Sequence, residues 1–211
     1  MEILTHLGQI FANKNIKPIR AKGCIHVGAH EGQEYNVYKA YGMNNIIFYE
    51  PLKENFQKLK SRLRYDPFVD LRMVALGNQT GEVEMHLEER GLSSSVLEPA
   101  HHLEQYPQIK FDKKETVKIV RLDDEEFPRE EYNFLNIDVQ GYELEVLRGA
   151  EETLKHIDII ISEVNRAEMY KGCARIEDID EFLLPRGFDK VFEYWQLDGG
   201  TWGDALYVRK Q

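Results

Sequence analysis

The chain has 211 residues, the size of one ordinary globular domain, and is long enough to bury a core without disulfides or a structural metal. Its formal net charge is −10, from 37 acidic and 27 basic side chains. A negative surface of this kind repels phosphate backbones and anionic lipid surfaces, so we expect neither nucleic acid nor a membrane as a partner.

Location and redox chemistry are also indicated by the composition. Residues 1–6 carry no basic segment, and no later apolar run approaches the length of a membrane span, which predicts a soluble cytoplasmic protein. The two cysteines, Cys24 and Cys173, have a spacing that fits neither a disulfide framework nor a zinc site. We expect one buried thiol and one loop thiol.

The first part of the chain alternates between strand and helix patterns. Residues 1–21 begin with apolar residues at helical spacing, which predicts a short helical cap on a sheet. The elements predicted after it are strand 24–27, helix 35–41, strand 46–49, helix 52–63 and strand 69–76. This β-α-β-α-β order is the first half of a doubly wound sheet.

The second part continues the pattern after an irregular segment. Residues 81–87 predict a further short strand, and residues 88–114 are polar and weakly patterned, which predicts a substrate-facing insertion. The later elements are an extended segment 117–120, a central strand 133–138, a helix from about 143 to 156, a strand 157–162, a helix 176–184 and a terminal antiparallel pair at 187–194 and 205–209. We therefore predict a single α/β domain over residues 1–211, with about seven mostly parallel strands, an antiparallel terminal strand and helices on both faces.

The turn after the first predicted strand carries the first sign of a ligand. Gly28 and Gly32 lie between strand and helix, where missing side chains let a ligand approach the backbone. Their G-x-x-x-G spacing lacks the third glycine of the dinucleotide fingerprint, so a nucleoside amino acid fits better than a pyrophosphate. Glu50 ends the second strand, where this topology places an acceptor for two ribose hydroxyls, although a strand-end carboxylate is also an ordinary feature.

Four blocks of the sequence resemble the FkbM family of methyltransferases. They are HVGAHEGQE at 26–34, YEP at 49–51, ALGN at 75–78 and NIDVQGYELEVLRGA at 136–150. The last block is the most specific, and the similarity runs from about Lys22 to the C-terminus. The chain departs from the common family pattern at His26, Asn136 and Gln140, where Asp, Lys and Glu are frequent.

The resemblance implies a Rossmann-like class I methyltransferase that uses S-adenosyl-L-methionine. It places the methionine portion on residues 28–33, the ribose on Glu50 and the adenine near the turn 76–78, and it gives Ser93, Ser94 and Ser95 a role as hydroxyl donors or, alternatively, as a polar loop. The expected cofactor-binding residues are Gly28, Ala29, His30, Glu31, Gly32, Gln33, Glu50, Leu76, Ser94 and Asp138.

Methyl transfer from a sulfonium requires alignment of the acceptor, and a hydroxyl acceptor also needs a base or a metal ion. Asp138 ends the fourth strand of the expected sheet, and Glu163 and Asn165 follow the fifth, so we expect these catalytic side chains to converge at one sheet edge. They are suited to hold Mg²⁺ or another divalent cation, as in metal-dependent O-methyltransferases. Alternatively, Asp138 or a histidine is the base, and the other two residues orient the acceptor.

Further candidates for a base and for acceptor binding are given by residue type. The histidines with a suitable intrinsic pKa range are His26, His30, His101 and His102. The aromatic and cationic side chains suited to stack on a pyranose ring are Tyr142, Arg166, Trp195 and Trp202.

Three classes of function remain open. O-methylation of a sugar hydroxyl, in a glycan or a glycosylated metabolite, is favoured by the compact acidic chain without a carrier-protein docking signature, and a polyketide-type acceptor is the alternative within the family. A noncatalytic nucleoside-binding partner in glycan assembly is the second class. A nicotinamide-dependent oxidoreductase is disfavoured by the missing third glycine.

Overall fold

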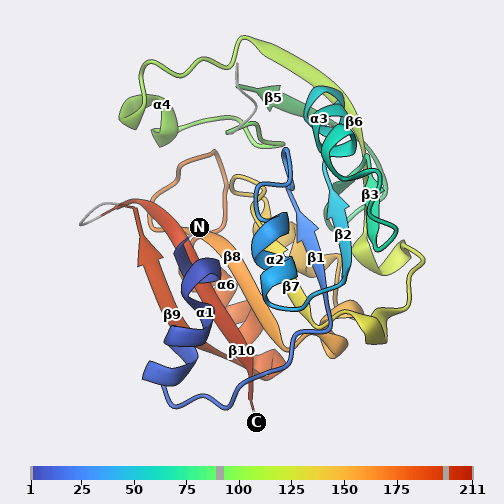
Figure 1. Ribbon diagram of the computed structural model, residues 1–211. Coiled ribbons are helices and arrows are strands. Elements are labelled where there is room, and N and C mark those ends of the chain that lie inside the picture. The colour runs from blue at the N-terminus through green and yellow to red at the C-terminus, as the bar shows by residue number, and fades with distance from the viewer. Residues whose placement is uncertain (1, 89–92, 197–199, 211) are drawn as a thin grey trace.

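The computed structural model describes residues 2–88, 93–196 and 200–210. Its main sheet has seven strands in the order β3-β2-β1-β7-β8-β10-β9. The bounds of these strands are β1 (Gly23–Val27), β2 (Asn45–Tyr49), β3 (Val69–Arg72), β7 (Phe134–Ile137), β8 (Ile159–Asn165), β9 (Phe188–Trp195) and β10 (Trp202–Arg209). Strands β3, β2, β1, β7 and β8 are parallel, and β10 is antiparallel to both of its neighbours, which confirms the predicted mostly parallel sheet (Figure 1).

Helices cover both faces of the sheet, as predicted. They are α1 (Glu2–Asn13), α2 (Tyr35–Ala40), α3 (Lys53–Leu63), α4 (His101–Gln105), α5 (Glu143–Arg148) and α6 (Ile176–Leu183), with 3-10 turns at Leu122–Asp124, Arg129–Glu131, Thr153–His156 and Leu184–Arg186. Apolar residues of α1, α2 and α3 share one core cluster with one face of the strands, and those of α5 and α6 share another with the opposite face. Figure 1 accordingly shows α1 and α2 in front of the sheet and α6 behind it.

The predicted strand 69–76 is wrong, because it is two strands in two sheets. Pairing of β3 with β2 ends where Glu50 N–H donates to Arg72 O at 3.1 Å, since β2 stops at Tyr49 and α3 follows. The chain then crosses to a second sheet of order β4-β6-β5, made of β4 (Ala75–Leu76), β5 (Gly81–Leu87) and β6 (Lys113–Val120). A continuous apolar run does not reveal that its partner strand has ended.

Two other boundaries also differ from the prediction. The expected helix 143–156 breaks at Gly149, where an added Cβ would lie 1.9 Å from Gly77 O, and it resumes as a separate 3-10 turn. The strand predicted at 157–162 begins at Ile159 and runs on to Asn165. We had expected Glu163 and Asn165 to follow this strand, but they lie within β8.

The connection between β5 and β6 lies at the carboxyl end of the main sheet. It contains α4, which Figure 1 shows on the side toward which β1 and β2 point. Residues 89–92 of the expected insertion 88–114 lie outside the described residues. In the part of the chain that the structure describes, no helix is long and apolar enough to cross a membrane.

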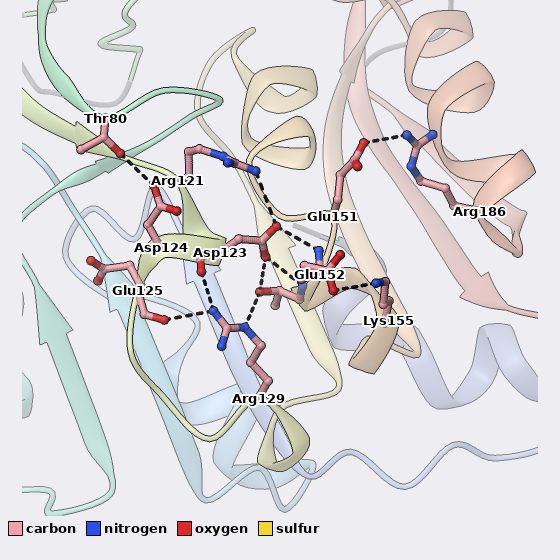
Figure 2. A network of polar contacts seen from close by, with 11 residues as sticks. Thr80, Arg121, Asp123, Asp124, Glu125, Arg129, Glu151, Glu152, Lys155 and Arg186 are labelled. Carbon is pink, nitrogen blue, oxygen red and sulfur yellow. Dashed lines mark hydrogen bonds and ion pairs between the residues drawn. The ribbon is translucent and has the colours of Figure 1, made fainter.

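The opposite end of the sheet is held by a polar network centred on Asp123 (Figure 2). The Asp123 carboxylate accepts hydrogen bonds from Glu152 N–H at 2.9 Å, and from both Thr153 N–H at 2.9 Å and Thr153 Oγ1 at 2.8 Å. Arg129 donates to the Asp123 backbone carbonyl at 2.7 Å and to that of Glu125 at 3.1 Å. These contacts join the turns that precede β7 and β8, away from the carboxyl ends of these strands.

Candidate active site

A cavity of about 240 Å³, called the first cavity here, opens at the carboxyl ends of β1, β2 and β7. Its wall includes eight of the predicted cofactor-binding residues, namely Gly28, Ala29, His30, Gln33, Glu50, Leu76, Ser94 and Asp138. Glu31 and Gly32 do not line it. The Glu31 carboxylate lies 3.1 Å from Lys58 Nζ, and Gly32 turns the chain at a φ of +71° beside Leu59.

The floor of the first cavity is a backbone turn that only glycine can make. Gly28 has a φ of +83°, and a Cβ on it would lie 1.8 Å from the backbone oxygen of Asp138. The N–H groups of Gly28 and Ala29 both donate to Tyr49 O at 3.0 Å. The turns after β1 and β7 therefore touch, which brings Asp138 to the cavity wall.

Glu50 is a fixed, buried carboxylate in the same wall. Its Oε2 accepts the His30 N–H at 2.8 Å and its Oε1 accepts the Leu52 N–H at 2.9 Å, with 4% of the residue exposed. Burial raises the pKa of Glu50 to about 7, although these backbone hydrogen bonds oppose the shift. Each carboxylate oxygen can accept a further hydrogen bond, so Glu50 suits a ligand with two neighbouring hydroxyls.

The two departures from the family pattern at His26 and Asn136 explain each other. They are direct partners on β1 and β7, and both contact Tyr38, with the Asn136 amide donating to Tyr38 Oη at 2.7 Å and His26 Nδ1 lying 3.1 Å from it. Burial lowers the pKa of His26 to about 3, so this imidazole is neutral. His26 thus belongs to a buried polar cluster and is poorly placed to act as a base.

Sequence reasoning missed Glu34, which also lines the first cavity. Its Oε2 lies 3.6 Å from His26 Nδ1, and burial, followed by the nearby charge of Asp138, raises the pKa of Glu34 to about 7. The signal that could have drawn attention to Glu34 is its place at the end of the block HVGAHEGQE at 26–34.

Asp138 and Glu163 are brought together through Gln140. The Gln140 Nε2 donates to Asp138 Oδ1 and to Glu163 Oε2, both at 2.8 Å, and Tyr170 Oη donates to Gln140 Oε1 at 2.8 Å. Gln140 has a φ of 56°, and its backbone oxygen accepts the Ser95 hydroxyl at 2.7 Å. The amide nitrogen is therefore held between the two carboxyl groups.

These carboxyl groups are electrostatically coupled. Burial raises the pKa of Asp138, while burial and then the charge of Asp138 raise that of Glu163 well above its usual range. A hydrogen bond between them lowers the pKa of Asp138 and raises that of Glu163. Like charges this close do not both ionise readily, so protonation of Glu163 is favoured over protonation of Asp138.

The tentative metal site at Asp138, Glu163 and Asn165 does not fit this geometry. The Gln140 amide nitrogen already donates to both carboxyl groups, which a cation at this place would have to bind instead, and Asn165 makes no hydrogen bond to either of them. Among the described residues, no group of three or more His, Cys, Asp or Glu side chains is placed to hold a metal ion. The expectation of a divalent cation is therefore not supported.

A second cavity, of about 300 Å³, shares Asp138 and Gln140 with the first. Its remaining wall comes from the β5–β6 connection, from β8 and the chain after it, and from β10, through Ser93, His102, Tyr106, Ile109, Glu163, Asn165, Met169, Tyr170 and Trp202. Of the four candidate histidines, only His102 lines this cavity. His101 is half-buried and its Nδ1 lies 2.8 Å from Glu104 Oε2, and His30 Nδ1 lies 2.8 Å from the Gln33 amide nitrogen.

Comparison with known proteins finds methyltransferases among the relatives of this chain and among solved structures of similar fold. The 2-O-methyltransferase NoeI of Sinorhizobium fredii is 33% identical over 142 residues, which are 63% of this chain, and the match spans only 56% of that longer relative. Among solved structures, magnesium protoporphyrin IX methyltransferase (ChlM) from Synechocystis PCC 6803 with bound SAM aligns at a TM-score of 0.53 and 10% identity over 99% of this chain and 79% of that one. Sp1610 of Streptococcus pneumoniae in complex with S-adenosyl-L-methionine aligns at 0.51 and 14% identity over 97% and 73% of the two chains.

The two structural matches establish a shared fold, and the family match goes further. The Methyltransferase FkbM domain matches residues 26–190, which contain the turn after β1, Glu50 and the segment from Asn136 to Ala150. The chain belongs to the FkbM family of S-adenosylmethionine-dependent methyltransferases.

Proposed function

We propose that this protein binds S-adenosylmethionine in the first cavity and transfers its methyl group to a hydroxyl of a sugar bound in the second. One observation carries the proposal: the two cavities meet at Asp138 and Gln140. A methyl group leaving the first cavity at this shared wall enters the second. Single-displacement transfer needs this alignment of sulfur, methyl carbon and acceptor oxygen.

The cofactor fits the first cavity part by part. Glu50 accepts hydrogen bonds from the ribose hydroxyls, the turn at Gly28 to Gln33 faces the methionine portion, and Leu76 packs beside the adenine. The buried carboxyl of Glu34 is suited to the α-ammonium group of the methionine portion. Ser94 contributes mainly to the wall, since its hydroxyl already accepts the Glu88 N–H at 3.0 Å.

The second cavity has the character of a site for a neutral polyol. Glu163 of β8 lines this cavity, and its direct cross-strand partner on β10 is Asp204, behind the wall, whose pKa burial raises to about 6. Carboxyl groups repel a phosphorylated acceptor and accept hydrogen bonds from hydroxyls. Trp202 and Tyr106, joined by a 2.9 Å hydrogen bond, add flat aromatic surface for the C–H face of a ring. Placing the acceptor here gives the insertion 88–114 its substrate-facing role within a single domain.

Asp138 is the proposed general base. As the acceptor oxygen bonds to the methyl carbon, the carbon–sulfur bond breaks, its electrons stay on sulfur, and the hydroxyl proton passes to the Asp138–Glu163 pair. Gln140 orients both carboxyl groups without a metal ion. The relative NoeI, named as a 2-O-methyltransferase, supports transfer to oxygen.

The test begins with calorimetric titration of the purified protein with S-adenosylmethionine, S-adenosylhomocysteine and NAD. Transfer is then measured with radiolabelled S-adenosylmethionine against methyl pyranosides, simple secondary alcohols and primary amines, and products are assigned by mass spectrometry and NMR. We expect binding of the sulfur cofactors only, and methyl ethers of pyranosides as products. Labelling of the alcohols instead would favour a polyketide-type acceptor, and cofactor binding without any transfer would favour a noncatalytic partner.

A further inference from the structure

Two side chains in the wall of the second cavity have buried polar atoms without a hydrogen-bond partner among the described residues. Asn165 is 1% exposed, and neither its Oδ1 nor its Nδ2 has a partner among the described residues. His102 is 5% exposed, and its Nδ1 is likewise unpaired. Buried polar groups in native proteins are nearly always hydrogen-bonded, because leaving them unpaired is destabilising. Two such groups in the wall of one cavity point to a ligand that pairs them.

The position of Asn165 relates it to the reacting groups. It lies two residues after Glu163 on β8, so both side chains are on the same face of the sheet, about 7 Å apart along the strand. Its direct partner on β10 is Trp202, which places the indole on that face as well. This spacing is comparable with the span between hydroxyls on opposite sides of one pyranose ring.

His102 is fixed on the outer side of the same cavity. Its ring packs against those of Tyr106, Phe111 and Tyr170, with centroids 5.2, 5.4 and 5.5 Å away, and its backbone N–H donates to Met169 O at 3.2 Å. Burial lowers the pKa of His102, which keeps the imidazole neutral. A neutral imidazole offers one donor and one acceptor nitrogen, which suits a hydroxyl better than a charged group.

We propose that Asn165 and His102 recognise the acceptor, and that they select an uncharged ring carrying further hydroxyls besides the one that is methylated. This inference rests on the proposed function, since it concerns the same acceptor. Both residues act on specificity: Asn165 binds a hydroxyl remote from Asp138, and His102 binds one on the side of α4. An acceptor with a single hydroxyl leaves both groups unpaired and is therefore rejected.

The test compares Asn165→Leu and His102→Phe, which keep the side-chain shape or the ring but remove the polar atoms. Matched controls are Asn45→Leu, at the amino end of β2, and His101→Phe, at the neighbouring histidine of α4; neither residue lines the first or the second cavity. We expect all four variants to bind S-adenosylhomocysteine like the wild type, and the two cavity variants to unfold at the same or a higher temperature. Only the cavity variants should lose kcat/KM, by at least tenfold and mainly through KM, with the best methyl pyranoside.

Deoxygenated acceptors separate recognition from a structural role. If Asn165 binds one hydroxyl, the wild type loses activity with the monodeoxy pyranoside that lacks it, whereas Asn165→Leu shows no further loss with that compound. Unchanged kcat/KM in both cavity variants overturns the inference while the proposed function stands. If the wild type methylates no pyranoside, the proposed function fails. Saturation-transfer NMR of methyl pyranosides with the S-adenosylhomocysteine complex then tests binding in the second cavity alone. Absence of binding in this experiment overturns the inference as well.

Discussion

Replacement of Glu50 by Gln is the sharpest test of the cofactor site. Both carboxylate oxygens already accept backbone N–H groups, so the ribose hydroxyls add bonds to a charge that is fixed in place. Two hydrogen bonds to a charged group, at about 1.5 kcal/mol each, give about 3 kcal/mol. We therefore expect Glu50→Gln to weaken binding of S-adenosylhomocysteine about 100-fold at pH 8.

The pH dependence checks the same reasoning independently. The pKa of Glu50 is about 7 in the free protein, and ribose hydroxyls that donate to it favour the ionised form. Binding then releases a proton, so affinity falls as pH drops below 7, by about tenfold per unit. Glu34 has a similar pKa and titrates in both the wild type and Glu50→Gln. The difference between the pH dependences of their affinities therefore reports Glu50 alone.

Calorimetry at pH 6, 7 and 8 makes the measurement, with Asp123→Asn as the control. Asp123 also accepts backbone N–H bonds but lines neither cavity, so its variant should lose stability and keep its affinity. Affinity of Glu50→Gln within twofold of the wild type, with an unchanged pH slope, would refute the ribose role of Glu50.

Four further outcomes are expected. In the folded protein the pKa values of Glu34 and Glu50 are about 7, against a usual 4.5, so the folded state binds more protons than the unfolded state. Urea unfolding should therefore show that the free energy of unfolding falls as pH rises from 5 to 8, by about 3 kcal/mol for each of the two groups. Gly28→Ala should abolish cofactor binding in calorimetry, because its added Cβ would clash with Asp138 O. The control Gly42→Ala, at a φ of +79° with open space around the added Cβ, should keep cofactor binding and lose only about 1 kcal/mol of stability to backbone strain. Asp123→Ala loses three hydrogen bonds, about 3 kcal/mol, which should lower the Tm by about 9 °C in a thermal melt. Exhaustive chelation should leave turnover within twofold in the radiolabel assay, and a loss restored by Mg²⁺ would refute the role given to Gln140.

The sequence was a good guide where structure and motif are local. The strand at 24–27, the glycine turn and Glu50 follow one another within one β-α-β unit, so their periodicity and spacing predicted the edge at which the first cavity opens. The split of residues 69–76 between two sheets was not predictable in this way. It depends on where the neighbouring strand β2 ends, which is a property of the tertiary structure.

The second cavity could not be read from the sequence for a related reason. Ser93, His102, Glu163 and Trp202 come from segments far apart in the chain, and no spacing rule links them. That the polar atoms of Asn165 lack hydrogen-bond partners can be known only from the three-dimensional structure, because it depends on which residues surround them. Sequence reasoning placed Asn165 with Asp138 and Glu163 at one sheet edge, and the structure adds that its amide lines the second cavity without a hydrogen-bond partner among the described residues.

The protonation of the Asp138–Glu163 pair links the site to the charge change of the reaction. In the proposed mechanism, a sulfonium cofactor brings one positive charge, and a pair that shares one proton would carry one negative charge. After the proposed transfer the sulfur is neutral and the acceptor's proton neutralises the pair, so the charges of the sulfonium and of the pair cancel at both ends of the reaction. Gln140 maintains this balance, because its amide donates to both carboxyl groups and adds no charge. Glu at position 140, frequent in the family, would add a third buried carboxyl and would need a cation or another proton to offset it.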